Sequence, residues 1–435
     1  MTTELKRRSF LTQTAIAGTM LAAPAVHAQR RGAQFKTCTI GSGWWGMNIT
    51  REAIHSGECK IAAICDVDQT HLDGAAKEIE EMTGTKPKIY KDFRELLSKE
   101  NPEIVINGTP DHWHPLITIA AVEKGAHVYV EKPISHTLKE GRAMVNAARA
   151  NNRMVQVGTH RRVAHHNTSG MDFLQSGKVG QIGMVRAFVH YGGGPGEPTP
   201  DSEIPAGLDW DMWCGPAPYR PYNTTIHPKG FRRHLDYANG QIGDWGIHWL
   251  DQILWWTEET YPKTVFSHGG RPIKRDSTDA PDHQIAVFEF EEFTAYWEHR
   301  FFGANESEKT NIGCYFYGTN GIFHIGWIDG WTFYPSNTSQ NIVHEDAKFE
   351  NTDRHNIKEL FADFLASIHS GGKRLPVCDI EIGHRSTSLS LLAMLSLKHG
   401  KSIEWDGQRE VCIGDEDANR LLTRQYRAPW QYPSV

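Results

Sequence analysis

Residues 36–68 constrain the fold of this chain more than any other stretch. A short apolar run, residues 37–40, precedes the turn Gly41-Ser42-Gly43-Trp44-Trp45-Gly46, and a helical pattern follows it. A second apolar run, residues 60–64, ends just before Asp66. A strand, a glycine turn, a helix and a strand in this order predict the first βαβ unit of a parallel sheet.

Each of the three glycines in this turn has a physical role if the ligand is a dinucleotide. Gly41 allows a tight strand-to-helix turn, Gly43 lets the backbone approach a diphosphate, and Gly46 lets helix and strand pack closely. The diphosphate would then lie on the free amides at the helix N-terminus, beside Trp44 and Trp45. A glycine-rich structural turn is the alternative, but the flanking strand and helix favour a nucleotide site.

An acidic residue supports this interpretation. Asp66 follows Gly46 by twenty residues, where a carboxylate can accept hydrogen bonds from an adenosine ribose. The same carboxylate would repel a 2′-phosphate, so the sequence favours NAD over NADP.

The N-terminus has the pattern of an export signal. Lys6-Arg7-Arg8-Ser9-Phe10-Leu11 contains a twin-arginine pair, a mildly apolar run covers residues 12–24, and Val26-His27-Ala28 resembles a cleavage site. We expect a twin-arginine signal and tether over residues 1–34, with export in folded form to the periplasm. Free NAD should be scarce there, so we also expect a tightly held cofactor that is loaded before export.

Composition excludes several other classes. A net charge of −6 and the absence of a basic run argue against a nucleic-acid partner. No run is long and apolar enough to predict a membrane span. The seven cysteines include no CxxC pair, which argues against a zinc ribbon or a disulfide framework. Cys38 and Cys65 lie in strands and are predicted to be buried thiols, and the sequence leaves a disulfide among the other five open.

Strands and helices alternate over residues 35–158, which predicts a doubly wound parallel sheet. Ligands of such sheets lie beyond the carboxyl ends of the strands. Two further turns fall there. They are Thr109-Pro110-Asp111-His112-Trp113-His114 and Glu131-Lys132-Pro133.

These two turns, the glycine turn and the later segment Asp244-Trp245-Gly246-Ile247-His248-Trp249-Leu250-Asp251 together resemble the Gfo/Idh/MocA family. The resemblance covers essentially the whole mature chain. It implies an α/β fold with a Rossmann domain over residues 35–158 and an α/β domain with a large, mostly antiparallel open sheet over residues 159–435. It also implies sugars or polyols as substrates, and Thr109, Pro110, His114 and Glu131 as cofactor-binding residues.

Lys132 is the first candidate catalytic residue. An amine at a strand end, near NAD⁺ in a partly desolvated cleft, can take a hydroxyl proton when neutral, while hydride leaves the same carbon. The resemblance adds that Lys132-Pro133 is a cis bond that aims the lysine and that Lys132 also touches the cofactor. A surface lysine in a Lys-Pro turn is the alternative.

The segment 244–251 supplies the other candidates. Read as one α-helix, it places Asp244, His248 and Asp251 on the same face. An imidazole that titrates near neutrality can relay the proton, and Asp244 can fix substrate hydroxyls or orient the imidazole. By resemblance Lys132, Asp244 and His248 form the catalytic set, whereas Asp251 is a weaker candidate with a structural alternative.

Three more regions carry weaker predictions. The turn after residue 158 places His160 and Arg161 near the nicotinamide by resemblance, although a solvent-exposed basic turn is the commoner explanation. His160 with His165 and His166 raises the possibility of a metal, but no carboxylate stands at supporting spacing, so we predict none. Arg232 matches a family position near the cofactor, although Phe231 stands before it where relatives tend to have Trp.

Residues 192–223 are rich in Gly and Pro, which predicts a long loop beside the cleft without a core element. Its aromatic side chains, Trp213 among them, either stack on a sugar ring or simply pack the loop. Period-two runs at 285–290 and 294–301, and a hairpin at 318–321, predict the second sheet. If one face of that sheet is exposed, it would suit a homo-oligomer interface.

Three function classes follow. The first is an oxidoreductase that moves hydride between a sugar or polyol carbon and NAD. The second is a redox-neutral enzyme that oxidises a hydroxyl transiently, eliminates a glycosidic bond and returns the hydride. The third is a cofactor-dependent binding protein without turnover, and the combination of Lys132, Asp244 and His248 argues against it. The first two share every residue named, so the sequence does not separate them.

Overall fold

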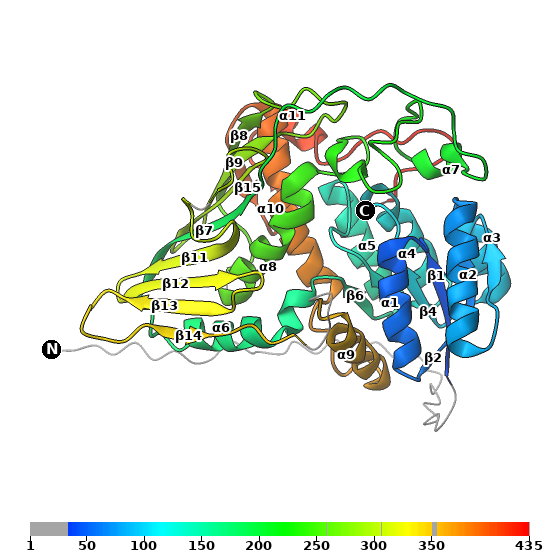
Figure 1. The fold of residues 1–435 in the computed structure, drawn as a ribbon, viewed down its shortest axis with the longest axis horizontal. Helices are drawn as coiled ribbons and strands as arrows, with labels where there is room; N and C mark the ends of the chain where they lie inside the picture. Colours follow the sequence, from blue (N-terminus) through cyan, green and yellow to red (C-terminus); the bar gives the residue numbers. More distant parts are fainter. Residues whose placement is uncertain (1–33, 258, 306, 350–354, 435) are drawn as a thin grey trace, which may run out of the picture. The chain divides into compact units, whose positions relative to one another are not determined.

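The computed structural model of the chain describes residues 34–257, 259–305, 307–349 and 355–434. The expected export signal, with its twin-arginine pair and cleavage site, lies outside the described residues. Two sheets organise the described chain, one in the blue to cyan half of Figure 1 and the other in the green to yellow half, with helix α10 (Ile380–His399) between them.

The first sheet has six parallel strands in the order β3-β2-β1-β4-β5-β6. This order, which reverses between β1 and β4, is that of a Rossmann fold and confirms the predicted class. The strands are β1 (Phe35–Ile40), β2 (Cys59–Cys65), β3 (Lys88–Tyr90), β4 (Ile104–Asn107), β5 (His127–Val130) and β6 (Val155–Val157). The helices are α1 (Trp44–His55), α2 (Gln69–Thr83), α3 (Phe93–Glu100), α4 (His114–Glu123) and α5 (Leu138–Ala150).

Local signals in the sequence set where these helices begin. Asp68 and Asp92 cap α2 and α3 by accepting hydrogen bonds from backbone amides, and Thr137 with Glu140 forms a capping box on α5. Helix α1 contacts α2 and α9 (Ile357–His369), whereas α4 contacts α3 and α5. Helices therefore cover both faces of the sheet, and its strands are mostly buried, as the apolar runs predicted.

The second sheet has ten strands in the order β14-β13-β12-β11-β7-β10-β9-β8-β15-β16. All its neighbouring strands run antiparallel except β7 and β10, which are parallel. The strands are β7 (Ile182–His190), β8 (Thr264–Gly270), β9 (His283–Glu289), β10 (Thr294–Arg300), β11 (Ile312–Gly318), β12 (Gly321–Gly326), β13 (Trp331–Pro335), β14 (Val343–Glu345), β15 (Ile403–Asp406) and β16 (Val411–Cys412). The mostly antiparallel open sheet is confirmed, as is the hairpin between β11 and β12.

One face of this sheet is covered by helices. Helices α6 (His165–Gln175), α8 (Ile247–Trp256) and α10 pack on it, and Trp249, Trp297 and Phe316 lie in the core between them. Helix α10 also contacts α5, so it links the two sheets. None of the helices in the described part of the chain is long and apolar enough to cross a membrane.

The C-terminal segment, which follows the short helix α11 (Glu416–Arg420), returns to the domain that contains the first sheet. Arg424 donates a hydrogen bond to Glu140, and Trp430 packs against Phe93 and Trp113. All seven cysteines lie within the described residues, and each is a buried free thiol, which answers the open question of a disulfide.

The loop 192–223 corrects one expectation. It contains a short helix, α7 (Trp210–Cys214), and a small core of its own, so the prediction that it holds no core element is wrong. Trp210 and Trp213 stack with ring centroids 4.6 Å apart, and Tyr222 packs edge-on against Trp210. Aromatic rings that stack on one another can build a core without the regular spacing that the prediction required.

Candidate active site

A cavity of about 1180 Å³ extends from the glycine turn to the start of α8. Fifteen of the predicted site residues line it. They are Gly41, Gly43, Trp44, Trp45, Asp66, Thr109, Pro110, His114, Glu131, Lys132, His160, Trp213, Arg232, Asp244 and His248. Gly46 lies under the turn, and Arg161 lies behind the cavity wall.

The glycine turn has the geometry that a diphosphate requires. Gly41 has a φ of +84°, and a Cβ on Gly46 would lie 1.9 Å from the carbonyl oxygen of Gly41. A Cβ on Gly43 would meet only the ring of His71, at 3.5 Å, so this backbone is open to the cavity. No side chain caps the N-terminus of α1, so its amides are available to an anion. These residues fit a dinucleotide.

Asp66 lies beside this turn, at the carboxyl end of β2. Its carboxylate accepts hydrogen bonds from the backbone amides of Ser42, at 2.8 Å, and Asp68, at 3.0 Å. His71 lies 3.6 Å away, and the hydrogen bond to Asp66 raises the pKa of its imidazole. The carboxylate is therefore fixed where the adenosine ribose of a dinucleotide would lie.

Residues 192–230, which we call the strap, comprise the loop 192–223 and the segment after it and cover this end of the cavity. Gln69 donates its amide to the carbonyl of Gly207, and Asp209 donates its amide to the carbonyl of Val67. The ring of His227 lies 3.0 Å from a carboxylate oxygen of Asp68. Backbone and side-chain contacts thus tie this strap to the residues that follow Asp66.

Two turns at the ends of β4 and β5 are joined by one side chain. The ring nitrogens of His114 lie 2.7 Å from the carbonyl oxygens of Thr109 and Pro133. The Lys132-Pro133 bond is cis, as the family resemblance implied. Glu131 is buried, and burial raises its pKa to about 7.

Lys132 and Asp244 form an ion pair that joins the first sheet to α8. The Lys132 Nζ atom donates to the Oδ1 atom and to the backbone carbonyl of Asp244, both at 2.8 Å. Arg232, on the 3₁₀ helix η3 (Phe231–Arg233), donates its Nε to the same Oδ1 at 3.1 Å. Although burial opposes ionisation, Lys132 and Arg232 lower the pKa of Asp244. Asp244 therefore orients the lysine and not the imidazole.

The helix that carries Asp244 differs from the prediction. Residues Ile242–Gly246 form a π-helical turn, η4, before α8 begins at Ile247. Because a π turn takes more residues than an α turn, the prediction that residues 244, 248 and 251 share one face is wrong. Asp244 and His248 line the cavity, whereas Asp251 is buried elsewhere in an ion pair with Arg162. Asp251 has the structural role that the sequence left open.

His248 is nearly buried and surrounded by rings. Its centroid lies 5.3 Å from that of His160 and 4.9 Å from that of Trp327. Burial, reinforced by the charge of Lys132, holds the pKa of His248 well below its usual value. The prediction that this imidazole titrates near neutrality is therefore wrong, because the sequence did not reveal how deeply it is enclosed. At neutral pH it is an uncharged hydrogen-bond acceptor.

The turn after β6 is buried and not exposed. His160, on the 3₁₀ helix η2 (His160–Val163), lines the cavity, whereas Arg161 lies with its guanidinium 3.5 Å from the ring centroid of Trp327. Arg161 supports the wall of the cavity through Trp327. Within the described residues, no three His, Cys, Asp or Glu side chains are arranged to hold a metal ion.

The sequence did not predict several of the residues that line the cavity. Asp111 lines the cavity, and burial raises its pKa to about 7. Trp327 directly follows β12, and Lys274 lies in the loop between β8 and β9. Neither residue belongs to a motif that the sequence revealed. Only Asp111 had a sequence signal, since it belongs to the turn after β4.

Comparison with known proteins agrees with this geometry. Residues 35–159 match the model of the Gfo/Idh/MocA oxidoreductase family, NAD-binding Rossmann fold. Residues 182–294 and 338–432 match the model of the C-terminal α/β domain of the same oxidoreductase family.

The chain belongs to the Gfo/Idh/MocA family.

Membership places the chain in an oxidoreductase family whose N-terminal domain has an NAD-binding Rossmann fold. Among curated proteins, the glycosyl hydrolase family 109 protein 1 of Shewanella sp. (strain ANA-3) is 27% identical over 156 residues, which are 35% of this chain and 34% of that protein. The α-N-acetylgalactosaminidase of Shewanella oneidensis is 26% identical over the same length. The match thus spans about a third of these curated relatives.

Solved structures share the fold over most of the chain. The WlbA dehydrogenase of Bordetella pertussis, in complex with NADH and UDP-GlcNAcA, has a TM-score of 0.63 and 17% identity, and covers 86% of this chain and 99% of its own. The aldose-aldose oxidoreductase of Caulobacter crescentus, complexed with glycerol, has a TM-score of 0.62 and 17% identity, with coverage of 85% and 99%. At this identity the similarity concerns the fold alone.

Proposed function

We propose that this chain oxidises a hydroxyl carbon of a sugar or polyol and that the hydride passes directly from this carbon to a tightly held NAD. Lys132, Asp244 and His248 are the proposed catalytic residues. One observation carries the proposal. The cavity that contains the open amides of the glycine turn also contains the Lys132–Asp244 pair and the neutral imidazole of His248.

The charges in this cavity suggest how the residues divide the work. Bound NAD would supply the hydride acceptor. The Lys132 ammonium, held by Asp244, stabilises negative charge on the substrate oxygen, and the neutral His248 ring accepts the hydroxyl proton. Arg232 shares the carboxylate of Asp244 and so holds the lysine in place. This assignment differs from the sequence-based prediction, in which Lys132 takes the hydroxyl proton and His248 relays it.

A second function is supported by the curated relatives. Proteins described as glycosyl hydrolases match this chain over a segment of 156 residues that includes about a third of it. In a redox-neutral glycosidase the same residues would oxidise a hydroxyl, assist elimination of the glycosidic bond and take the hydride back.

One experiment separates the two. The purified protein is incubated with aryl glycosides and with free sugars, without added NAD. Released phenol without net NADH supports glycoside cleavage, and NADH that accumulates on a free sugar only when NAD is added supports the dehydrogenase. Neither product on any sugar would remove both functions.

Export and cofactor retention belong to the same proposal. The twin-arginine pair at Arg7 and Arg8 supports export of the folded protein to the periplasm. The strap tied to residues 67–69 would slow cofactor release. An Arg7→Lys, Arg8→Lys double variant should remain in the cytoplasm with an uncleaved N-terminus, as measured by fractionation and mass spectrometry.

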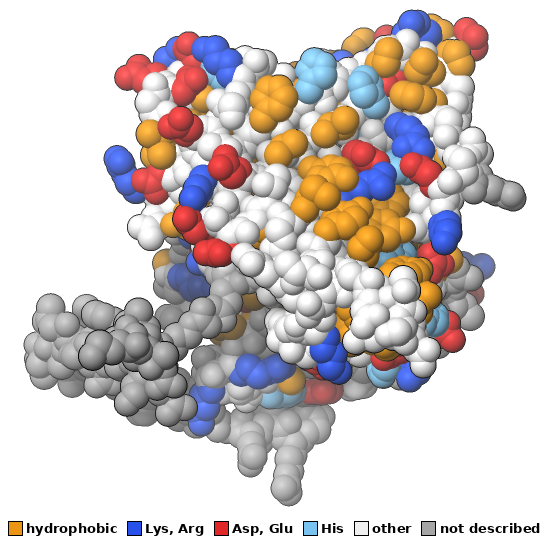
Figure 2. Space-filling model, turned by 90° about the vertical axis from the view of Figure 1, so that its left-hand side faces the viewer, with side chains coloured by type: hydrophobic (Ala, Val, Ile, Leu, Met, Phe, Trp, Pro, Cys, Tyr) orange, Lys and Arg blue, Asp and Glu red, His pale blue; other side chains and the backbone are white. Residues whose placement is uncertain are grey.

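The open face of the second sheet is a candidate homo-oligomer surface. Hydrophobic side chains gather on this face in Figure 2. Strand register places two rows on it, one with Phe266 and Val287 and the other with Met184, Ile322 and Tyr334. Light scattering should give a molar mass of more than one chain, and a Val287→Glu variant should shift that mass toward the monomer.

A further inference from the structure

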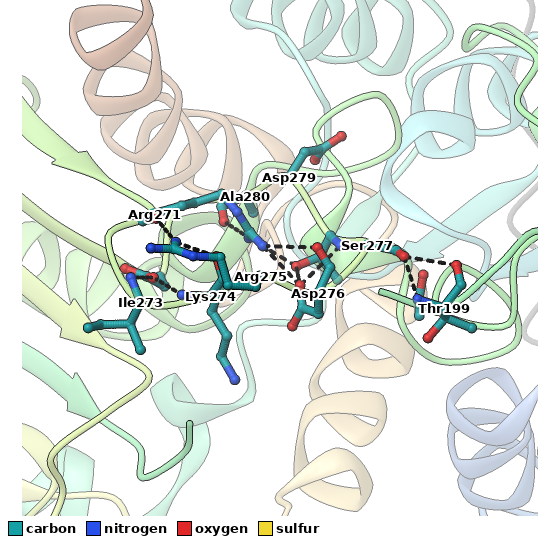
Figure 3. Close-up of polar contacts among 12 residues, drawn as sticks. Thr199, Arg271, Ile273, Lys274, Arg275, Asp276, Ser277, Asp279 and Ala280 are labelled. Atoms are coloured by element: carbon teal, nitrogen blue, oxygen red, sulfur yellow. Dashed lines mark hydrogen bonds and ion pairs between the residues drawn. The ribbon is translucent and has the colours of Figure 1, made fainter. Parts of the chain in front are cut away.

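The loop that joins β8 to β9, residues 271–282, is drawn in Figure 3, and its residues Lys274, Asp276 and Thr278 line the cavity. Its shape is fixed by its own polar contacts. Arg271 donates to Asp276, Thr278 and the carbonyl of Ala280, at 2.7 to 3.0 Å. Asp282 accepts the amides of Ile273 and Lys274, at 2.9 and 2.7 Å. The loop is therefore rigid before any ligand binds.

This rigid loop presents a lysine that its own contacts do not use. In Figure 3 the side chain of Lys274 extends away from the network, and no contact is drawn to its ammonium group. Lys274 lines the cavity, as does Arg233 on η3. In the parts of the chain that the structure describes, neither side chain has a carboxylate within ion-pair distance. Asp276, an acidic residue of the same loop that also lines the cavity, is paired with Arg271.

Several contacts connect the segments that carry the two cations to each other and to the catalytic pair. The carbonyl of Arg233 accepts the amides of Asp279 and Ala280, so η3 is joined to the loop. Both cations lie near Phe301. The Arg233 guanidinium lies 5.2 Å from its ring centroid, and a Cβ on Gly193 would meet both the Phe301 carbonyl oxygen, at 2.8 Å, and the Lys274 Nζ atom, at 3.4 Å. The residue before Arg233, Arg232, contacts Asp244, which holds Lys132.

An aromatic wall lies next to the cations. Tyr191 and Phe301 stack with centroids 5.9 Å apart, and Trp245 packs edge-on against Tyr191 at 6.0 Å. All three line the cavity. Flat aromatic faces suit the apolar face of a sugar ring, whereas two cations that pair with no carboxylate among the described residues suit an anionic substituent. A planar guanidinium matches a carboxylate with two parallel hydrogen bonds.

We propose that Lys274 and Arg233 form a subsite for an anionic group, a carboxylate or a sulfate ester, on the sugar whose hydroxyl carbon faces Lys132. This inference rests on the proposed function and adds its substrate class, namely acidic sugars. A neutral sugar would cover both cations without compensating their lost hydration. Because the loop is preorganised, binding the anion requires little ordering of the protein.

Equilibrium binding tests the proposal independently of turnover. Isothermal titration of the NAD-loaded protein compares methyl glycosides of glucose, galactose and mannose with the matching uronic acids and 6-sulfates. We expect at least one acidic sugar to bind about tenfold more tightly than its neutral partner, with a preference that falls as salt is added. The uronic acid and sulfate arms show which anion the subsite prefers.

Variants then assign the preference to the two residues. The acidic-to-neutral affinity ratio should fall about tenfold in Lys274→Met and in Arg233→Gln, and Lys274→Arg should retain it. Lys178→Met, which removes the same charge outside the cavity, is the matched control. No acidic preference in any pair, or a ratio that both variants leave intact, would overturn the inference. Because no hydride transfer is measured, that failure leaves the proposed function standing, whose own failure is the absence of any product.

Discussion

The two ends of the cavity are built in different ways. At the nucleotide end, the glycine turn, the helix it opens and Asp66 all lie within about thirty residues and follow from backbone conformation. At the substrate end, Lys132, Asp244, Lys274 and Trp327 come from segments spread over about two hundred residues, and only side-chain packing brings them together. Local backbone rules therefore describe the first end, whereas tertiary contacts determine the second.

The largest expected effect concerns the substrate end. Lys132→Met removes the cation that faces the substrate oxygen, so hydride transfer should slow on the order of 10³-fold. The nucleotide end should be unaffected, and the variant should still copurify with NAD. Rapid mixing with a reactive sugar, followed through the absorbance of the reduced nicotinamide, measures the rate. A variant that keeps wild-type speed would remove Lys132 from the chemistry.

A pair of glycine variants tests the nucleotide end. In Gly46→Ala the new Cβ would meet the Gly41 carbonyl at 1.9 Å, so we expect destabilisation of about 3 kcal/mol. In Gly43→Ala the Cβ meets only His71 at 3.5 Å, so the fold should persist while NAD affinity falls. Chemical denaturation and NAD titration distinguish them. Equal stability losses in the two variants would contradict the distinct roles of the glycines.

Glu131 lies between the two ends and should make stability depend on pH. Its pKa is raised from 4.5 to about 7 by burial, so the folded state binds the proton more tightly than the unfolded state. The resulting stabilisation is fully present below about pH 4.5 and is lost as the pH rises through 7, and it amounts to about 3 kcal/mol. Glu131→Gln should reduce this slope.

Denaturation of the NAD-free protein at pH 5 and pH 8 checks the prediction. Asp111, whose pKa is also raised to about 7, still titrates in the variant, so part of the slope should persist. If Glu131→Gln follows the wild-type curve at both pH values, the carboxyl is not responsible.

The smallest effect is expected for His248. Because burial keeps its pKa well below the usual value, the imidazole does not gain a proton near pH 6.5. The rate of hydride transfer should therefore show no acidic limb near pH 6.5, and His248→Asn should slow it by about tenfold to a hundredfold without changing that region. A limb near pH 6.5 that disappears in the variant would show that the histidine titrates there.

The sequence predicted most of the nucleotide end. Strand and helix patterns, the glycine spacing and Asp66 all match the structure, because each depends on residues close to it in the chain. The same reasoning placed Lys132 and His248 in the cavity through the family resemblance. It could not predict the π turn before α8, which separates Asp251 from Asp244, because one extra residue per turn leaves no compositional trace.

Burial was the other quantity that the sequence could not supply. The neutral state of His248 and the burial of Arg161 depend on neighbours more than thirty residues away in the chain. The paired rings of Trp210 and Trp213 depend on stacking within a loop. Lys274 had no signal at all, since a lysine in a polar loop is ordinarily solvated. Only the structure shows that the hydrogen bonds of its loop hold Lys274 at the cavity.

The most direct test of the account is an experimental structure of the protein with NAD bound. We predict that the diphosphate lies on the amides of α1 and that C4 of the nicotinamide faces the Lys132 amine and the His248 ring across the cavity. A nucleotide bound elsewhere, or a nicotinamide turned away from both side chains, would contradict the proposed chemistry.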